Sequence, residues 1–107
     1  MNKLFPIVLV LLFFGCTEEE NELTKVLDNY ESFCSRNSGK DIESMSDAQL
    51  ADFKKMIEDK SLSFQDKIKK VEHLDISNAA MKTNEINLCI ALINRHISSE
   101  KLNRLNE

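Results

Sequence analysis

The sequence predicts an all-α protein, a small bundle of about four helices that one disulfide is expected to join. Three observations predict this class. Apolar residues recur with the spacing of an amphipathic helix in several segments of the chain. Beyond residue 15 the chain has no proline and a single glycine, Gly39, so it has few of the turn formers that strands and hairpins require. Two cysteines, Cys34 and Cys89, fall on the apolar faces of the first and the last predicted helix.

The first helix is predicted from about residue 19 to about residue 37. Thr17 and Glu20 have the spacing of a capping box, and the acidic residues around them suit the positive end of the helix dipole. Gly39 follows Asn37 and Ser38 and is expected to end the helix in a left-handed conformation. The apolar face of this helix carries Leu23, Val26, Leu27, Tyr30, Phe33 and Cys34.

A second capping pattern predicts the start of the next helix, because Ser46 can cap it and Gln49 follows three residues later. This helix is expected to end near Asp59, and Ser61 or Ser63 is expected to begin a third helix. The apolar face of the second helix carries Leu50, Phe53, Met56 and Ile57. The apolar face of the third carries Phe64, Ile68, Val71 and Leu74.

The fourth helix is predicted within Ser77–Ile97, and Ser98 is expected to cap a last short turn. Its apolar stripe consists of Ile86, Cys89, Ile90, Ile93 and Ile97. Three further residues widen this apolar surface: Leu88, Ala91 and Leu92. A helix that is apolar on most sides is usually buried between others, so we expect the segment Ile86–Ile93 to lie at the centre of the bundle.

The N-terminal segment has the form of a signal peptide. Lys3 precedes an uninterrupted apolar run from Leu4 to Phe14, which is shorter than the roughly 20 residues that cross a bilayer as a helix. Gly15 then stands directly before Cys16. This segment resembles the signal of bacterial lipoproteins, whose lipobox ends in a small residue followed by the cysteine that receives the lipid. The two preceding positions depart from the usual lipobox, because Phe13 and Phe14 stand where leucine and a small residue are typical.

The resemblance implies cleavage after Gly15, a thioether-linked diacylglycerol on Cys16 and acylation of the new amino group. Residues 1–15 would then be the cleaved signal, residues 16–22 a lipidated cysteine with a short acidic tether, and residues 23–107 the helical domain. Two or more acyl chains anchor a protein stably. Thr17, in place of aspartate after the cysteine, implies a bacterial cell-envelope protein on the periplasmic face of the outer membrane. An ordinary secretory signal with an incidental cysteine and an uncleaved signal anchor are the alternatives.

The two remaining cysteines are the only possible disulfide pair once Cys16 carries lipid. Disulfides persist outside the cytoplasm, and a bridge from Cys34 to Cys89 would close a loop of about 55 residues, which stabilises a fold by roughly 4 kcal/mol. Two buried free thiols are the alternative interpretation. A redox-active pair is a further one, which the lack of Cys-x-x-Cys spacing disfavours.

Composition and spacing argue against several classes of function. The net charge of −4 becomes −5 when the signal and its one lysine are removed, and an acidic protein is a poor ligand for nucleic acid. His73 and His96 lack the spacing of zinc ligands, and one glycine cannot form a phosphate-binding loop. The acids alternate with lysines, as on a solvated helix face. We therefore expect neither an enzyme nor a metal or other cofactor.

The expected partners are the membrane, through the acylated Cys16, and a second envelope protein. The sequence predicts a non-catalytic protein-binding module, and its size and address suggest an immunity or exclusion factor. An accessory structural subunit of an envelope complex is the alternative, and a redox role for the thiols is a third possibility. A basic edge across the second and third helices is a possible partner-binding surface, with an ordinary solvated surface as the alternative. This edge would carry Lys54, Lys55, Lys60, Lys67, Lys69 and Lys70.

Overall fold

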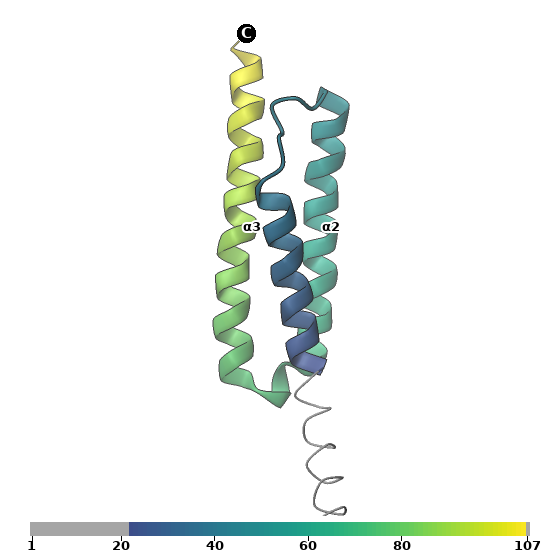
Figure 1. Ribbon diagram of the computed structural model, residues 1–107, viewed down its shortest axis with the longest axis vertical. Helices are drawn as coiled ribbons and strands as arrows, with labels where there is room; N and C mark the ends of the chain where they lie inside the picture. The colour runs from purple at the N-terminus through teal and green to yellow at the C-terminus, as the bar shows by residue number, and fades with distance from the viewer. Residues whose placement is uncertain (1–21, 107) are drawn as a thin grey trace, which may run out of the picture.

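Three long helices account for nearly all of residues 22–106, which are the residues that the computed structural model describes (Figure 1). The N-terminal helix covers residues 22–38, α2 spans Asp47–Val71 and α3 spans Ile76–Leu105. A short 3-10 turn, η1, spans Glu72–Leu74 and connects α2 to α3. The helices lie side by side, and the chain reverses at the loop 39–46 and again at η1. No strand occurs within residues 22–106, so the all-α prediction is confirmed.

The prediction of about four helices is wrong, because the second and third predicted helices form one continuous helix, α2. The segment Asp59–Ser63 contains neither proline nor glycine, so nothing in its backbone interrupts the helix. Ser61, predicted as a possible cap, lies on the buried face of α2, where its hydroxyl is 2.6 Å from the hydroxyl of Tyr30. That serine therefore supplies a hydrogen bond to the core instead of starting a helix.

The last helix is also longer at both ends than predicted. Asp75 caps its start, with the Asp75 carboxylate accepting a hydrogen bond of 3.1 Å from the backbone N–H of Asn78. The helix continues through Ser98 to Leu105, so the predicted separate turn after Ser98 does not exist. Serine is tolerated inside a helix that packing already holds.

The capping box predicted at Ser46 is confirmed, and the one predicted at Thr17 and Glu20 lies outside the described residues. The backbone N–H of Gln49 donates to the Ser46 hydroxyl at 3.1 Å, and the backbone N–H of Ser46 donates to the Gln49 side chain at 2.8 Å, so the capping box is complete. The predicted left-handed cap at Gly39 is wrong, because no glycine among the described residues has a positive φ. At the helix end the backbone N–H of Lys40 instead donates to the Asn37 carbonyl at 3.4 Å, and the Ser38 hydroxyl donates to the Ser35 carbonyl at 3.0 Å.

The predicted apolar faces meet in one core between the three helices. Tyr30 and Phe64 stack with ring centroids 4.9 Å apart, and Phe33 lies 5.7 Å from the same Phe64 ring. Ile42, in the loop 39–46, is only 2% exposed, although no helical pattern predicts its burial. The buried apolar residues are Leu23, Leu27, Tyr30, Phe33, Cys34, Ile42, Leu50, Phe53, Ile57, Ile68, Ala79, Ile86, Ile90, Ile93 and Ile97.

The helix α3 is buried on one face only. Ile86, Ile90 and Ile93 point into the core as predicted, whereas Leu88 and Leu92 remain 62% and 64% exposed. The prediction that the whole segment Ile86–Ile93 is surrounded by other helices is therefore wrong. A bundle of three helices places both neighbours of α3 on the same side, so its opposite face meets no other part of the described chain.

A disulfide joins the N-terminal helix to α3, which confirms the predicted pairing of Cys34 with Cys89. The two Cα atoms are 6.3 Å apart, within the range that a disulfide requires. Cys34 is buried and Cys89 is half-buried, so the bridge lies at the edge of the core.

Arg104, near the end of α3, holds the loop 39–46 against the bundle. Its guanidinium donates to the carboxylates of Asp47 at 2.7 Å and Glu100 at 3.0 Å. It also donates to the backbone carbonyls of Ile42 at 3.1 Å and Met45 at 2.7 Å. The hydrogen bond with Asp47, followed by that with Glu100, raises the pKa of Arg104 above its ordinary value. Four acceptors from three segments thus fix one side chain.

Replacing Cys34 and Cys89 together by alanine should lower the free energy of unfolding by about 4 kcal/mol, because the unfolded chain regains the freedom of a long loop. Urea denaturation followed by circular dichroism measures this loss. The unchanged protein in excess reductant is the matched control and should show the same loss. Equal stability of the oxidised and reduced protein would contradict the stabilising role of the bridge.

Replacing Arg104 by methionine should loosen the loop 39–46, because the carbonyls of Ile42 and Met45 lose their donors. Hydrogen exchange at the loop amides is then expected to accelerate several-fold. Lys101→Met, which removes an exposed charge from the same helix, should leave the exchange unchanged. Unaltered exchange in the Arg104 variant would show that the buried side chain of Ile42 alone holds the loop.

Candidate functional site

The predicted lipidation site, Cys16, lies outside the described residues 22–106. Within that range none of the helices combines the length and the apolar character that a membrane span needs. The first described residue, Glu22, belongs to the end of the bundle that also carries η1 (Figure 1). Any attachment upstream of Glu22 therefore reaches the bundle at this end.

The six lysines of the predicted basic edge all lie on α2, because the two helices that were expected to carry them are one. Lys67 and Lys69 are two residues apart, which separates them by about 200° around the helix axis. Lys67 lies with its ammonium group 5.5 Å from the centre of the Phe64 ring, on the flank that meets the N-terminal helix. Lys54 lies 3.8 Å from the carboxylate of Glu58. The lysines are thus distributed around α2, among acidic residues.

The disulfide lies beside a shallow hollow of about 230 Å³ between the N-terminal helix and α3. The hollow is lined by Glu31, Ser35, Glu85 and Ile86 together with both cysteines. At its edge the Lys82 ammonium group is 3.0 Å from the Glu31 carboxylate. This hydrogen bond is the main reason that the pKa of Lys82 is raised. The bridge therefore lies among side chains that join the same two helices.

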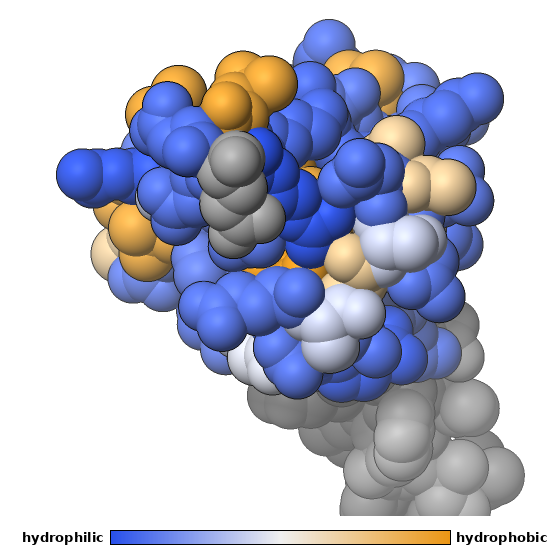
Figure 2. Space-filling view, turned by 90° about the horizontal axis from the view of Figure 1, so that it is seen from above, coloured by the Kyte–Doolittle hydropathy of each residue, from blue (hydrophilic) through white to orange (hydrophobic). Residues whose placement is uncertain are grey.

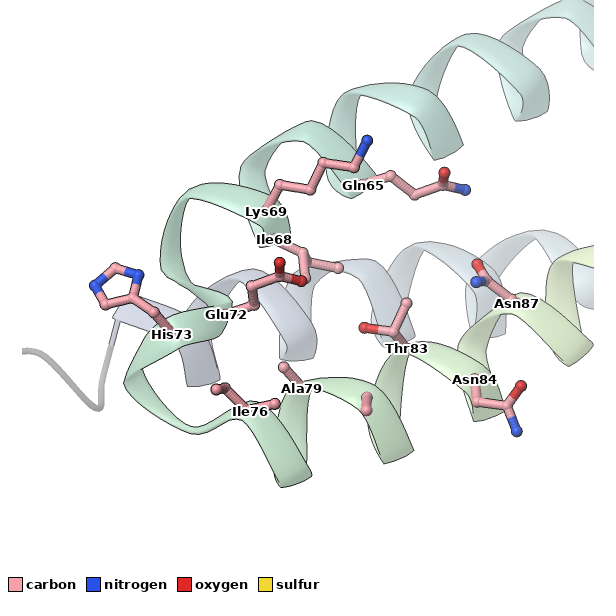
Figure 3. Close-up of a pocket in the computed structure, with 11 residues that line it drawn as sticks. Gln65, Ile68, Lys69, Glu72, His73, Ile76, Ala79, Thr83, Asn84 and Asn87 are labelled. Carbon is pink, nitrogen blue, oxygen red and sulfur yellow. The ribbon is translucent and has the colours of Figure 1, made fainter.

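A larger cleft of about 540 Å³ opens where α2, η1 and α3 meet (Figure 3). Ile68 and Ala79 form apolar parts of its wall, and polar side chains from both long helices complete it. His73 belongs to the outer rim, and in Figure 3 its ring points away from the other residues. The residues lining the cleft are Gln65, Ile68, Lys69, Glu72, His73, Ile76, Ala79, Ala80, Thr83, Asn84 and Asn87.

Behind this cleft, a chain of hydrogen bonds crosses all three helices. Tyr30 has no exposed surface, and its hydroxyl donates to the Asn87 side-chain carbonyl at 3.0 Å. A phenol has one proton to donate, so the Ser61 hydroxyl, 2.6 Å away, must donate to Tyr30. Ser61 in turn accepts from the Gln65 side-chain amide at 3.4 Å. These hydrogen bonds, in the order Gln65, Ser61, Tyr30, Asn87, give the buried phenol both a donor and an acceptor. They also hold Gln65 and Asn87 in place in the cleft wall.

Two buried side-chain oxygens have no hydrogen-bond partner among the described atoms: Oγ1 of Thr83, in the cleft wall, and Oδ1 of Asn94. The described residues also contain no cluster of three or more histidine, cysteine or acidic side chains that could hold a metal ion. The cleft offers amide and hydroxyl groups over apolar carbon, together with the side chains of Lys69, Glu72 and His73.

The face of α3 that points away from the core carries four exposed apolar residues, with polar residues such as Asn84 and Ser99 between them and few charges. Met81, Leu88, Leu92 and Leu102 lie on it within about 80° of arc, and we call these four residues the outer α3 stripe. Each is at least 60% exposed. Figure 2, which looks down on the C-terminal end of α3, shows apolar side chains in orange interrupting a mostly hydrophilic surface.

Two charged residues, Glu85 and Arg95, lie about 40° to either side of the line midway between Leu88 and Leu92, and Arg95 falls within the arc of the outer α3 stripe. Both are exposed, and neither forms an ion pair with another described residue. Interface centres are depleted of charge relative to the rest of a protein surface. The part of the stripe around Leu88 and Leu92 therefore has the composition of a contact surface, while Arg95 and Ser99 interrupt the stripe toward Leu102. The sequence shows Leu88 and Leu92 as apolar residues of this helix, but their pattern predicted that they would be buried in the core.

The chain has no match among family models, curated proteins or solved structures. The candidate surfaces are therefore assigned from the geometry of this chain alone.

Replacing Tyr30 by phenylalanine should lower the free energy of unfolding by about 1–3 kcal/mol, because the buried Ser61 hydroxyl loses its acceptor. In a chain that already carries Ser61→Ala the same replacement should cost less, since that hydroxyl is no longer left unpaired. Denaturant titration of the four proteins measures the coupling. Fully additive losses would show that the two hydroxyls act independently. Ser63→Ala, on the exposed face of α2, is the control for the serine change.

Proposed function

We propose that this protein is a lipid-anchored component of the bacterial cell envelope that acts by binding another protein and not by catalysis. The lipobox-like end of the signal, Gly15-Cys16, supports the anchor and the address on the periplasmic face of the outer membrane. Protection of the cell as an immunity or exclusion factor is the role that its size and address suggest.

The observation that carries the binding role is the outer α3 stripe. Monomeric proteins rarely leave extended apolar patches in water, and such patches commonly mark contact sites. Leu88 and Leu92 are adjacent on the helix surface and more than 60% exposed, in a protein small enough to need its apolar residues for its own core. Their exposure is explained if a partner covers them.

The tether would hold the binding surface near the membrane. Five residues, 17–21, lie between the lipidated cysteine and the first described helix, so the chain from Cys16 to Glu22 spans at most about 20 Å. The end of the bundle that carries η1 would then lie within this distance of the lipid. A partner reached by this surface would be a protein of the same membrane or a neighbour close to it.

A second candidate function, an accessory subunit of an envelope complex, is favoured by the same stripe. Subunits that dock permanently bury apolar surface that would be costly to expose when free. An immunity or exclusion factor meets its target only at intervals, and its contact surface is expected to be more polar.

Replacing Cys16 by alanine should abolish lipid attachment and leave the chain unprocessed or soluble, because the acyl acceptor is gone. Metabolic labelling with a fatty-acid analogue, followed by membrane fractionation, measures both effects. The double variant with Cys34→Ala and Cys89→Ala is the matched control, and it should keep both its lipid label and its membrane location. Label in the Cys16 variant would mean that lipid is attached at another residue. Absence of label from the unchanged protein would mean that no lipoprotein processing occurs.

Chemical crosslinking in intact membranes tests the binding role. Replacing Leu88 and Leu92 by aspartate should remove the captured protein, while Leu62→Asp, an equally exposed leucine on α2, should not. Failure of the unchanged protein to capture any protein would refute the proposed function.

A further inference from the structure

We infer that the outer α3 stripe binds a second copy of this chain, with the two α3 helices antiparallel. This inference rests on the proposed protein-binding function and names the partner. It is carried by the position of the apolar and charged residues relative to the level of Ile90, which is midway between Leu88 and Leu92.

The first step is the shape of the surface. The outer α3 stripe runs along α3 for about 32 Å and is only about one helix diameter wide. A long, narrow apolar line matches another helix, which packs side by side along its length. A helix that lies on a membrane surface is instead flanked by lysine and arginine, whereas one of the two charges beside this stripe is acidic, Glu85.

The second step is self-complementarity about a two-fold axis. In an antiparallel pair whose axis passes beside Ile90, each residue lies at the height of the residue equally far beyond Ile90 in the other copy. Leu88 then lies at the height of Leu92 of the second copy, whereas Met81 lies at the height of Ser99 and Leu102 at the height of Asn78. Both leucines are within about 20° of the centre of the face, on opposite sides of it, so that they interdigitate.

The third step is charge. Glu85 and Arg95 are each five residues from Ile90, so the antiparallel arrangement brings Glu85 to the height of Arg95 of the second copy, twice in each dimer. A parallel arrangement in register would place Glu85 beside Glu85 and Arg95 beside Arg95. Opposite charges across an interface fix orientation, and like charges exclude the wrong one. The two charges nearest the stripe thus favour the antiparallel pair.

The fourth step is area. The apolar part of the stripe measures roughly 300 Å² per copy, below the about 800 Å² that each partner contributes to a stable interface of standard size. The dimer is therefore weak in dilute solution and depends on local concentration. Attachment of both copies to one membrane supplies that concentration when the pair lies along the membrane surface, because the antiparallel arrangement places the two η1 ends about 42 Å apart along α3.

The test uses the full chain in the membrane of cells that express it. A photo-crosslinking amino acid, p-benzoylphenylalanine, replaces the exposed Leu88. On illumination we expect a product of two copies, in which mass spectrometry finds position 88 linked to the segment around Leu92 of the second copy. A link to a different protein overturns this inference and leaves the proposed function standing. A link to lipid alone, or no product, overturns both.

Charge reversal tests the antiparallel arrangement with the same probe. Glu85→Arg and Arg95→Glu should each lower the yield of the two-copy product about tenfold, because each replaces two attractive pairs by two repulsive ones. The double variant E85R/R95E, and a mixture of the two single variants, should restore the yield, since opposite charges meet again. Asp66→Arg, an exposed charge on α2, should change nothing. Loss without restoration would overturn the antiparallel pairing.

Discussion

The covalent bond between Cys34 and Cys89 is the constraint on which the rest of this small bundle depends. A domain of this size buries too little of its surface for a large margin of stability. The bridge joins the N-terminal helix to α3, the two helices that are not consecutive in the chain. Once these two are held together, α2 can pack against both. The ion pair between Lys82 and Glu31 lies across the same seam.

Polar contacts then select one arrangement of the three helices. Apolar packing alone tolerates small shifts of one helix along another. The hydrogen bonds from Ser61 to Tyr30 and from Tyr30 to Asn87 require one residue from each helix at the same level of the bundle. At the far end, Arg104 ties the loop 39–46 to the last turns of α3. The bundle is therefore specified at its middle and at one end by groups that have few alternative partners.

The two faces of α3 have different tasks. The isoleucines of one face fill the core, while the outer α3 stripe remains in water. The N-terminal helix and α2 both pack against one side of α3. This packing stabilises the bundle and leaves the opposite side of α3 exposed. The proposed lipid anchor at one end of the bundle and the apolar line along its side would together describe a protein that meets others near a membrane. This description joins the proposed function to the proposed pairing of two copies.

The sequence by itself determined the helical class, the capping box at Ser46, the pairing of Cys34 with Cys89 and most of the residues that face the core. These features depend on the spacing of neighbouring residues or on the small number of cysteines, and both can be counted along the chain. It also carries the lipobox-like Gly15-Cys16, which lies outside the described residues.

Only the tertiary structure decided how many helices there are and which apolar residues stay exposed. Serine is compatible with both a helix start and a helix interior, and the phenol of Tyr30 above Ser61 selects the interior. Leu88 and Ile90 are both strongly apolar, so whether each is buried or exposed depends on which side of α3 the two other helices occupy. Burial is a property of the arrangement of helices, and a local pattern cannot say how many neighbours a helix will have.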